Sequence, residues 1–115
     1  MALDGETGPV RVRNLEGAIR MTTYIILSRL SPEFLKEPKA ILKLAKTVGD
    51  KIKAECPGIR WKASYATLGR YDIVDIVEAA DPKEIEKVVL ILRSYAHERT
   101  ETSVATPWEE FLKAV

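Results

Sequence analysis

The chain has 115 residues, of which 46% are hydrophobic and 30% are charged. This length suits one domain with a single core, and this composition is typical of a globular protein with a heavily charged surface. Eighteen basic and seventeen acidic residues leave a formal charge of +1, so no overall field favours nucleic acid or an anionic membrane. We therefore predict neither of them as a partner.

The first twenty residues contain glycines and scattered charges but no apolar run of the kind found in a signal peptide or a membrane span. We expect residues 1–20 to form a tail or extension, in which residues 10–13 alternate and could add a strand to a sheet edge. Residues 21–115 are expected to form the domain. Cys56 is the only cysteine, which excludes an intramolecular disulfide and, with no export signal, suggests a reducing, cytoplasmic location.

The first predicted elements of the domain are a strand and a helix. Residues 23–30 are rich in β-branched side chains and end at Ser31-Pro32, which predicts a strand. Its apolar residues are consecutive from Tyr24 to Leu27, so both faces are expected to be buried. Residues 38–55 form the predicted helix, because apolar side chains recur at three- and four-residue steps. These side chains are Ile41, Leu44, Ala45, Val48 and Ile52.

Two alternating stretches follow, and we predict that they form a β-hairpin. Residues 59–68 and 71–78 are separated by Gly69-Arg70, the one strong turn signal between them. Gly69 is expected to supply a positive φ in the turn. The alternation predicts that Trp61, Ala63 and Tyr65 share one face, whereas the second strand carries apolar residues on both faces.

The end of the chain predicts a helix, a strand and a short helix. Asp81-Pro82 is typical of a capping residue followed by the first helical position, so a helix is expected to begin at Pro82. A polar strand is expected over 98–105, and residues 106–109 repeat the capping pattern before a terminal helix that bears Trp108. The buried stripe of the first of these helices is predicted to contain Ile85, Val88, Val89, Leu92 and Ala96.

The order β-α-β-β-α-β predicts an α+β, ferredoxin-like sandwich in which both main helices cover one face of a four-stranded antiparallel sheet. Two strands nevertheless have apolar residues that point both ways, and one chain cannot cover the second face. Burying that face against a second copy would stabilise by about 25 cal/mol per Å² of apolar surface. We therefore predict a homodimer or a higher homo-oligomer formed through the sheet face.

The hairpin also carries a resemblance to a known family. The chain from Met21 to Phe111 resembles the GYD-domain family of small bacterial and archaeal proteins, named for a Gly-x-Tyr-Asp-type motif after the second strand. Two features depart from the family: Ala80 stands where proline is common, and residues 103–105 replace a more usual Leu-Arg-Ala-Phe-like run. The resemblance implies a dimeric α/β-barrel type of fold and brings little information on function. The residues that carry it are Thr23 to Leu27, Leu68 to Val74 with Gly69-Arg70-Tyr71-Asp72 at the centre, Glu78-Ala79 and Thr100 to Thr102.

Several side chains are candidates for a site, each with a plainer alternative. Asp72 could act as an acid or base, or accept backbone hydrogen bonds at the hairpin. Trp61, Tyr65 and Tyr71, with Asp72, could bind a small molecule, or pack in the core or a dimer interface. His97 is a second candidate base, although the dipole of the preceding helix explains its position equally well. One histidine alone makes no metal site, and we predict neither a metal nor a cofactor.

Cys56 is interpreted as a small buried hydrophobe rather than a nucleophile, because no base is placed near it. Asp72 and Glu78 share a strand face, but about 20 Å of strand separates them, which is too far for a catalytic pair.

Three functions remain open. The leading hypothesis is a homo-oligomeric small-ligand-binding or accessory protein. The first alternative is an enzyme that resembles cofactor-independent monooxygenases or isomerases of the dimeric α/β-barrel type, with Asp72 or His97 as the general base. The second is a purely structural oligomer subunit. A polar cavity that contains Asp72 would favour the enzyme, a mostly apolar cavity the ligand binder, and a fully packed interior the structural subunit.

Overall fold

The computed structural model describes residues 20–115. The predicted tail and the strand considered at residues 10–13 lie outside the described residues. The elements, in chain order, are β1 (Thr22–Leu30), α1 (Pro32–Leu35), α2 (Pro38–Glu55), β2 (Arg60–Ala66), β3 (Ile73–Ala79), α3 (Pro82–Ser94), β4 (His97–Ala105) and α4 (Trp108–Ala114).

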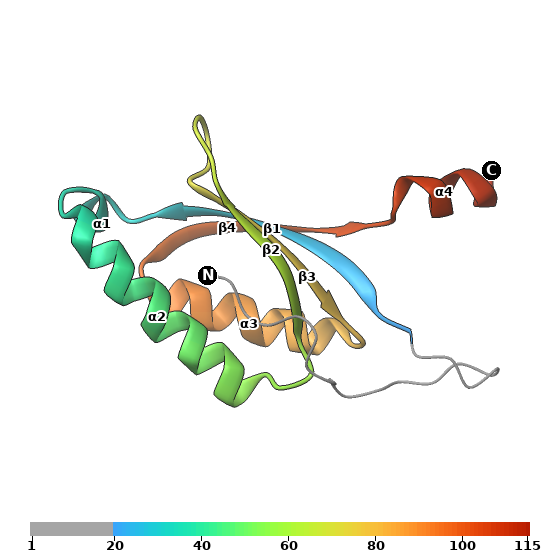
Figure 1. Ribbon diagram of the computed structural model, residues 1–115, viewed down its shortest axis with the longest axis horizontal. Helices are drawn as coiled ribbons and strands as arrows, with labels where there is room; N and C mark the ends of the chain where they lie inside the picture. The colour runs from blue at the N-terminus through green and yellow to red at the C-terminus, as the bar shows by residue number, and fades with distance from the viewer. Residues whose placement is uncertain (1–19) are drawn as a thin grey trace.

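The four strands form one antiparallel sheet in the order β2-β3-β1-β4. Helices α2 and α3 lie side by side against the same face of this sheet, and no described element covers the other face (Figure 1). The α+β, ferredoxin-like prediction is therefore confirmed. Helix α4 follows β4 and extends away from the body of the molecule (Figure 1).

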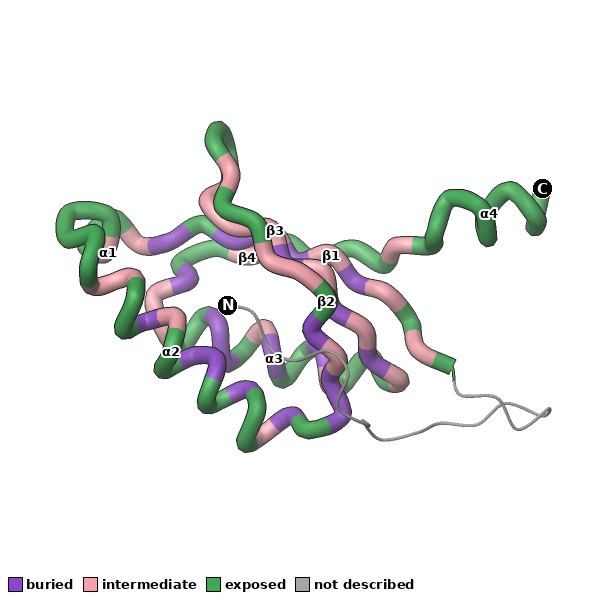
Figure 2. Tube along the Cα trace, viewed as in Figure 1, coloured by how far each residue is buried: buried purple, intermediate pink, exposed green. Residues whose placement is uncertain are grey.

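The core lies between the sheet and the two long helices, where the buried residues of Figure 2 face one another. Strand β1 shows the pattern clearly, because every second residue from Tyr24 to Leu30 is buried. Its buried side chains meet those of α2 and α3. The largest fully buried side chains are Trp61, Ile26, Ile52, Leu92, Val48, Val77, Val88, Asp75 and Ser28.

Local sequence signals fix the start of α3 and the hairpin turn. The Asp81 side chain accepts a hydrogen bond from the Lys83 backbone N–H at 2.8 Å, so the predicted cap before Pro82 is confirmed. Gly69 has a φ of +106°, which confirms the predicted turn. The second predicted cap was wrong, because α4 begins after Pro107 without a side-chain cap.

The buried face of α3 is broader than the predicted stripe. Ile91 is buried, although it is not among the predicted stripe residues, and Val89 is only partly buried. The reason is that α3 contacts β3, β4 and α2, so side chains on more than one side of the helix find neighbours.

The predicted shared face of Trp61, Ala63 and Tyr65 was wrong. The pairing of β2 with β3 shifts between Trp61 and Ala63, so that Trp61 lies opposite Val77 whereas Ala63 lies opposite Ile76. The shift places one extra residue in β2, and an extra residue reverses the sheet faces of all side chains that follow it. Trp61 therefore enters the core at 2% exposure, and Tyr65 lies on the uncovered face at 58% exposure.

The uncovered face of the sheet is apolar at its centre, as the sequence predicted. We call it the open face and define it by five side chains, which are only partly buried apart from the exposed Tyr65. Ile25 pairs with Ile76, and Leu27 pairs with Val74, so these side chains form a contiguous patch. The open face comprises Ile25, Leu27, Tyr65, Val74 and Ile76.

Candidate functional site

The helix-covered face of the sheet contains a chain of polar contacts in an otherwise apolar core. The Trp61 indole Nε1–H donates to Ser64 Oγ at 2.8 Å, and the Ser64 hydroxyl donates to Asp75 Oδ1 at 2.6 Å. The register shift in β2 creates this arrangement, because it turns Ser64 toward the helices directly opposite Asp75. One serine therefore pairs with both a buried indole N–H and one oxygen of a buried carboxyl group.

Asp75 is fully buried. Burial raises the pKa of its carboxyl group above the ordinary value, and the hydrogen bond from Ser64 opposes this effect only in part. The second carboxyl oxygen, Oδ2, has no hydrogen-bond partner among the described residues. Ser28 lies on the same face, one diagonal step away on β1, and its hydroxyl is also buried without a partner in the described part of the chain.

His97 begins β4 and is 3% exposed. Its Nδ1 lies 3.0 Å from the backbone oxygen of Tyr95. A carbonyl oxygen only accepts hydrogen bonds, so Nδ1 carries a proton, and in the uncharged form of the ring Nε2 is the acceptor. No described residue donates to this Nε2.

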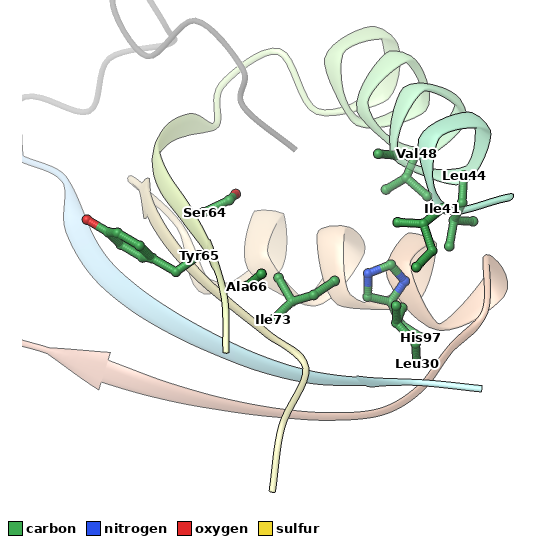
Figure 3. A pocket seen from close by; sticks show the side chains of 10 residues that line it. Leu30, Ile41, Leu44, Val48, Ser64, Tyr65, Ala66, Ile73 and His97 are labelled. Atoms are coloured by element: carbon green, nitrogen blue, oxygen red, sulfur yellow. The ribbon is translucent and has the colours of Figure 1, made fainter. Parts of the chain in front are cut away.

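A cavity of about 210 Å³ lies between α2 and the sheet. Figure 3 shows His97 at one end of it, beneath Ile41 and Leu44, with Ile73 and Ala66 on the sheet side. Ser64 lies toward the other end, and the Tyr65 ring points away from His97 (Figure 3). The lining is mostly apolar, which by our criterion favours a ligand binder. The lining residues are Leu30, Ile41, Leu44, Ala45, Val48, Ser64, Tyr65, Ala66, Ile73 and His97.

The structure does not gather the four predicted ligand-binding residues at one site. Trp61 is buried against the helices, and Tyr65 lies on the open face. Tyr71 donates its hydroxyl proton to the Glu101 carboxylate on β4, and this bond raises the pKa of Tyr71. Asp72 Oδ2 accepts from the Leu30 backbone N–H at 2.8 Å. Asp72 thus links the hairpin to the end of β1, which is the structural role weighed from the sequence.

Cys56 is a buried free thiol. Burial raises the pKa of this thiol, so the reactive thiolate is disfavoured at neutral pH. Its interpretation as a buried hydrophobe is confirmed.

Across residues 20–115, no group of three or more potential ligand side chains is arranged to hold a metal ion. No helix in the same range combines the length and the apolar character needed to cross a membrane.

Sequence reasoning missed Ser28, Ser64 and Asp75 as a cluster. One signal was present, because Asp75 alternates with the inward-facing Val77 and Ala79 along β3. A lone acid at a core position of a strand is unusual, so the alternation along β3 marks Asp75 as a candidate.

Comparisons with known proteins place the chain among relatives. The GYD domain family matches residues 24–115. A protein from Thermus thermophilus, named "Glutamine synthetase and cystathionine beta-lyase binding protein", is 35% identical over 91 residues. That similarity covers 76% of this chain and 90% of the Thermus protein.

Two solved structures share the fold at 16% identity. A mutant chlorite dismutase from Candidatus Nitrospira defluvii gives a TM-score of 0.61 over 97% of this chain, and MtbAldR gives 0.54 over 75%. This chain spans about half of each, 47% and 52% of their lengths, so these likenesses concern the fold alone. The extent of the family match and the identity with the Thermus relative show that this chain belongs to the GYD domain family.

Proposed function

We propose that this protein is a homo-oligomeric accessory protein of the cytoplasm that binds metabolic enzymes. The observation that carries the proposal is the 35% identity with a relative whose printed name makes it a binding protein for glutamine synthetase and cystathionine beta-lyase. The similarity extends over 90% of that relative, so most of its surface has a counterpart here. We propose enzymes of the same two kinds as partners.

The open face supports the homo-oligomeric part of this proposal. Covering a partly exposed aliphatic side chain contributes about 1 kcal/mol. Five side chains from each of two copies therefore contribute about 10 kcal/mol before the cost of association. A micromolar dimer requires about 8 kcal/mol after that cost, so contacts around the patch must add to this gain. Charged side chains border this patch on the same face, because Glu101 pairs with Leu27 and Glu78 pairs with Thr23. Their desolvation opposes the contact.

The site geometry gives limited support to the two other functions. A general base requires a nitrogen or oxygen that is free to accept a proton, and no described residue engages Nε2 of His97 in the cavity. The other candidate base, Asp72, is bound to the Leu30 backbone and does not line that cavity. The cavity itself argues against a subunit with a fully packed interior. We therefore keep the accessory role as the conclusion.

Binding to purified enzymes tests the proposal. Glutamine synthetase and cystathionine beta-lyase from the source organism are each immobilised, and the full-length protein is titrated over them by biolayer interferometry. Saturable binding to at least one of the two is expected, with no binding to an immobilised lysozyme of similar surface density. Absence of binding to both enzymes at about 100 μM would correspond to less than about 5.5 kcal/mol of affinity, and would contradict the proposal.

A further inference from the structure

The cavity between α2 and the sheet combines an apolar lining with one buried acceptor that no described residue satisfies. We propose that it binds a small, uncharged, mostly apolar molecule that carries one hydrogen-bond donor, and that His97 Nε2 accepts this hydrogen bond. This goes beyond the accessory role and does not depend on it, because it rests on the lining of the cavity and not on any relative.

The tautomer of His97 is held by its own backbone surroundings. Nδ1 donates to the Tyr95 oxygen, which leaves the lone pair on Nε2. Figure 3 shows one ring nitrogen directed toward Ile73, across the cavity. A buried acceptor without a partner is unfavourable, because its bonds to water are lost and not replaced. A ligand that donates one hydrogen bond to Nε2 replaces the hydrogen bond from water that burial removed.

The backbone before His97 is held in a conformation that places this ring. Ala96 has a φ of +68°, a region that residues other than glycine rarely adopt. Its backbone oxygen accepts from Ser31 N–H at 2.8 Å, which fixes the turn between α3 and β4. The His97 side chain therefore enters the cavity from an anchored position rather than from a mobile loop.

The size of the cavity limits the ligand. An apolar protein cavity of about 150 Å³ holds a benzene molecule, so a space of about 210 Å³ suits one ring with a small substituent. The wall contributed by α2 consists of Ile41, Leu44, Ala45 and Val48, all of which offer only dispersion contacts.

The lack of charged side chains in the lining favours an uncharged ligand. None of the described residues that line the cavity is Lys, Arg, Asp or Glu. The nearby Asp75 carboxyl group is engaged by Ser64, and burial disfavours its charge. An ion in the cavity would lose its hydration without gaining a counter-charge in the lining.

Phenol and toluene form a matched pair of probes, because they have similar volumes and differ in one hydroxyl donor. Their affinities for the full-length protein are measured by ligand-observed NMR titration up to about 10 mM, a range that captures weak fragment binding. We expect phenol to bind about tenfold more tightly than toluene, which is the effect of one hydrogen bond. Equal affinities, or no binding of phenol, would overturn the proposal.

Two variants locate the binding to this cavity. Ala45→Phe fills the cavity from α2 and is expected to abolish binding of both probes, whereas Leu42→Phe, at a 73% exposed position of the same helix, leaves binding unchanged. His97→Phe removes the acceptor and is expected to make the affinities for phenol and toluene equal. Undiminished phenol binding by a folded Ala45→Phe protein would refute the site even if His97→Phe fails to fold.

Enzyme binding supplies a separate readout. If the inference fails while the protein still binds its enzyme partners, the accessory role stands without a ligand site. If enzyme binding fails while the protein binds phenol more tightly than toluene as expected, the cavity is a ligand site of a protein with another role.

Discussion

Replacing Ser64 by alanine tests the buried polar chain most severely. The Ser64 hydroxyl accepts from Trp61 Nε1 at 2.8 Å and donates to Asp75 Oδ1 at 2.6 Å. Trp61 is 2% exposed and Asp75 is 0% exposed, so neither can turn to bulk water when the hydroxyl is lost. Each buried polar group left unsatisfied costs about 1–3 kcal/mol. We expect Ser64→Ala to lower the free energy of unfolding by about 2–4 kcal/mol, because two such groups lose their partner and relaxation recovers part of the cost.

Urea unfolding measures this change, with far-UV circular dichroism and tryptophan fluorescence as two probes. All variants are compared at the same protein concentration, because self-association adds to the apparent stability. Ser94→Ala is the matched control. Ser94 is exposed, and within residues 20–115 its hydroxyl donates to the Leu90 backbone oxygen of its own helix. Its loss should therefore change the free energy of unfolding by less than about 0.5 kcal/mol.

The comparison of the two serine variants decides whether the contacts from Trp61 to Asp75 stabilise the protein. If Ser64→Ala is no more destabilising than Ser94→Ala, the buried chain from Trp61 to Asp75 contributes nothing to stability, and the reasoning about the core is refuted.

Three further predictions concern single residues. In Asp75→Asn, stability relative to the wild type should increase as the pH rises from about 4 toward neutral. Burial raises the folded-state pKa of Asp75, so the wild type loses stability from its unfolded-state pKa upward until the folded-state pKa is passed. Urea unfolding across this pH range measures how the difference in free energy of unfolding between the variant and the wild type changes with pH. A difference that stays constant would contradict the prediction. Asp72→Ala should cost about 1–2 kcal/mol, because the Leu30 backbone N–H loses its acceptor, and thermal unfolding that shows no loss would count against this role. Ala96→Gly should stabilise by about 0.5–1 kcal/mol, since glycine adopts the φ of +68° without a steric penalty, and a lower unfolding midpoint would show that Ala96 is not strained.

Much of the fold could be predicted because its signals are local. The cap at Asp81, the turn at Gly69 and the helical spacing of α2 each depend on residues a few positions apart. The order of the elements then left one common topology. The apolar residues on both faces of β1 and β3 also predicted the open face before any pairing was known.

The faces of β2 could not be predicted in the same way. An extra residue at the register shift between Trp61 and Ala63 is set by pairing with β3, which strict alternation within one strand does not reveal. The error propagated to the site, because Trp61 and Tyr65 were expected together and lie on opposite faces of the sheet.

The candidate site was predicted only in part for a related reason. His97 was singled out by residue type, but its cavity arises from α2, β2 and β3 packing around it. Asp75 and Ser64 are distant in sequence and meet only through the shifted pairing of the hairpin strands. A local pattern carries no information about such a contact.

The open face and its coverage by a second copy are the central claim, and sedimentation equilibrium tests it most directly. The full-length protein at about 10 μM is compared with Ile76→Lys, which places a charge in the open face, and with Leu90→Lys, at a position on α3 that is 66% exposed. We predict a mass of at least two chains for the wild type and Leu90→Lys, and of one chain for Ile76→Lys. A wild-type protein with the mass of one chain would contradict the account.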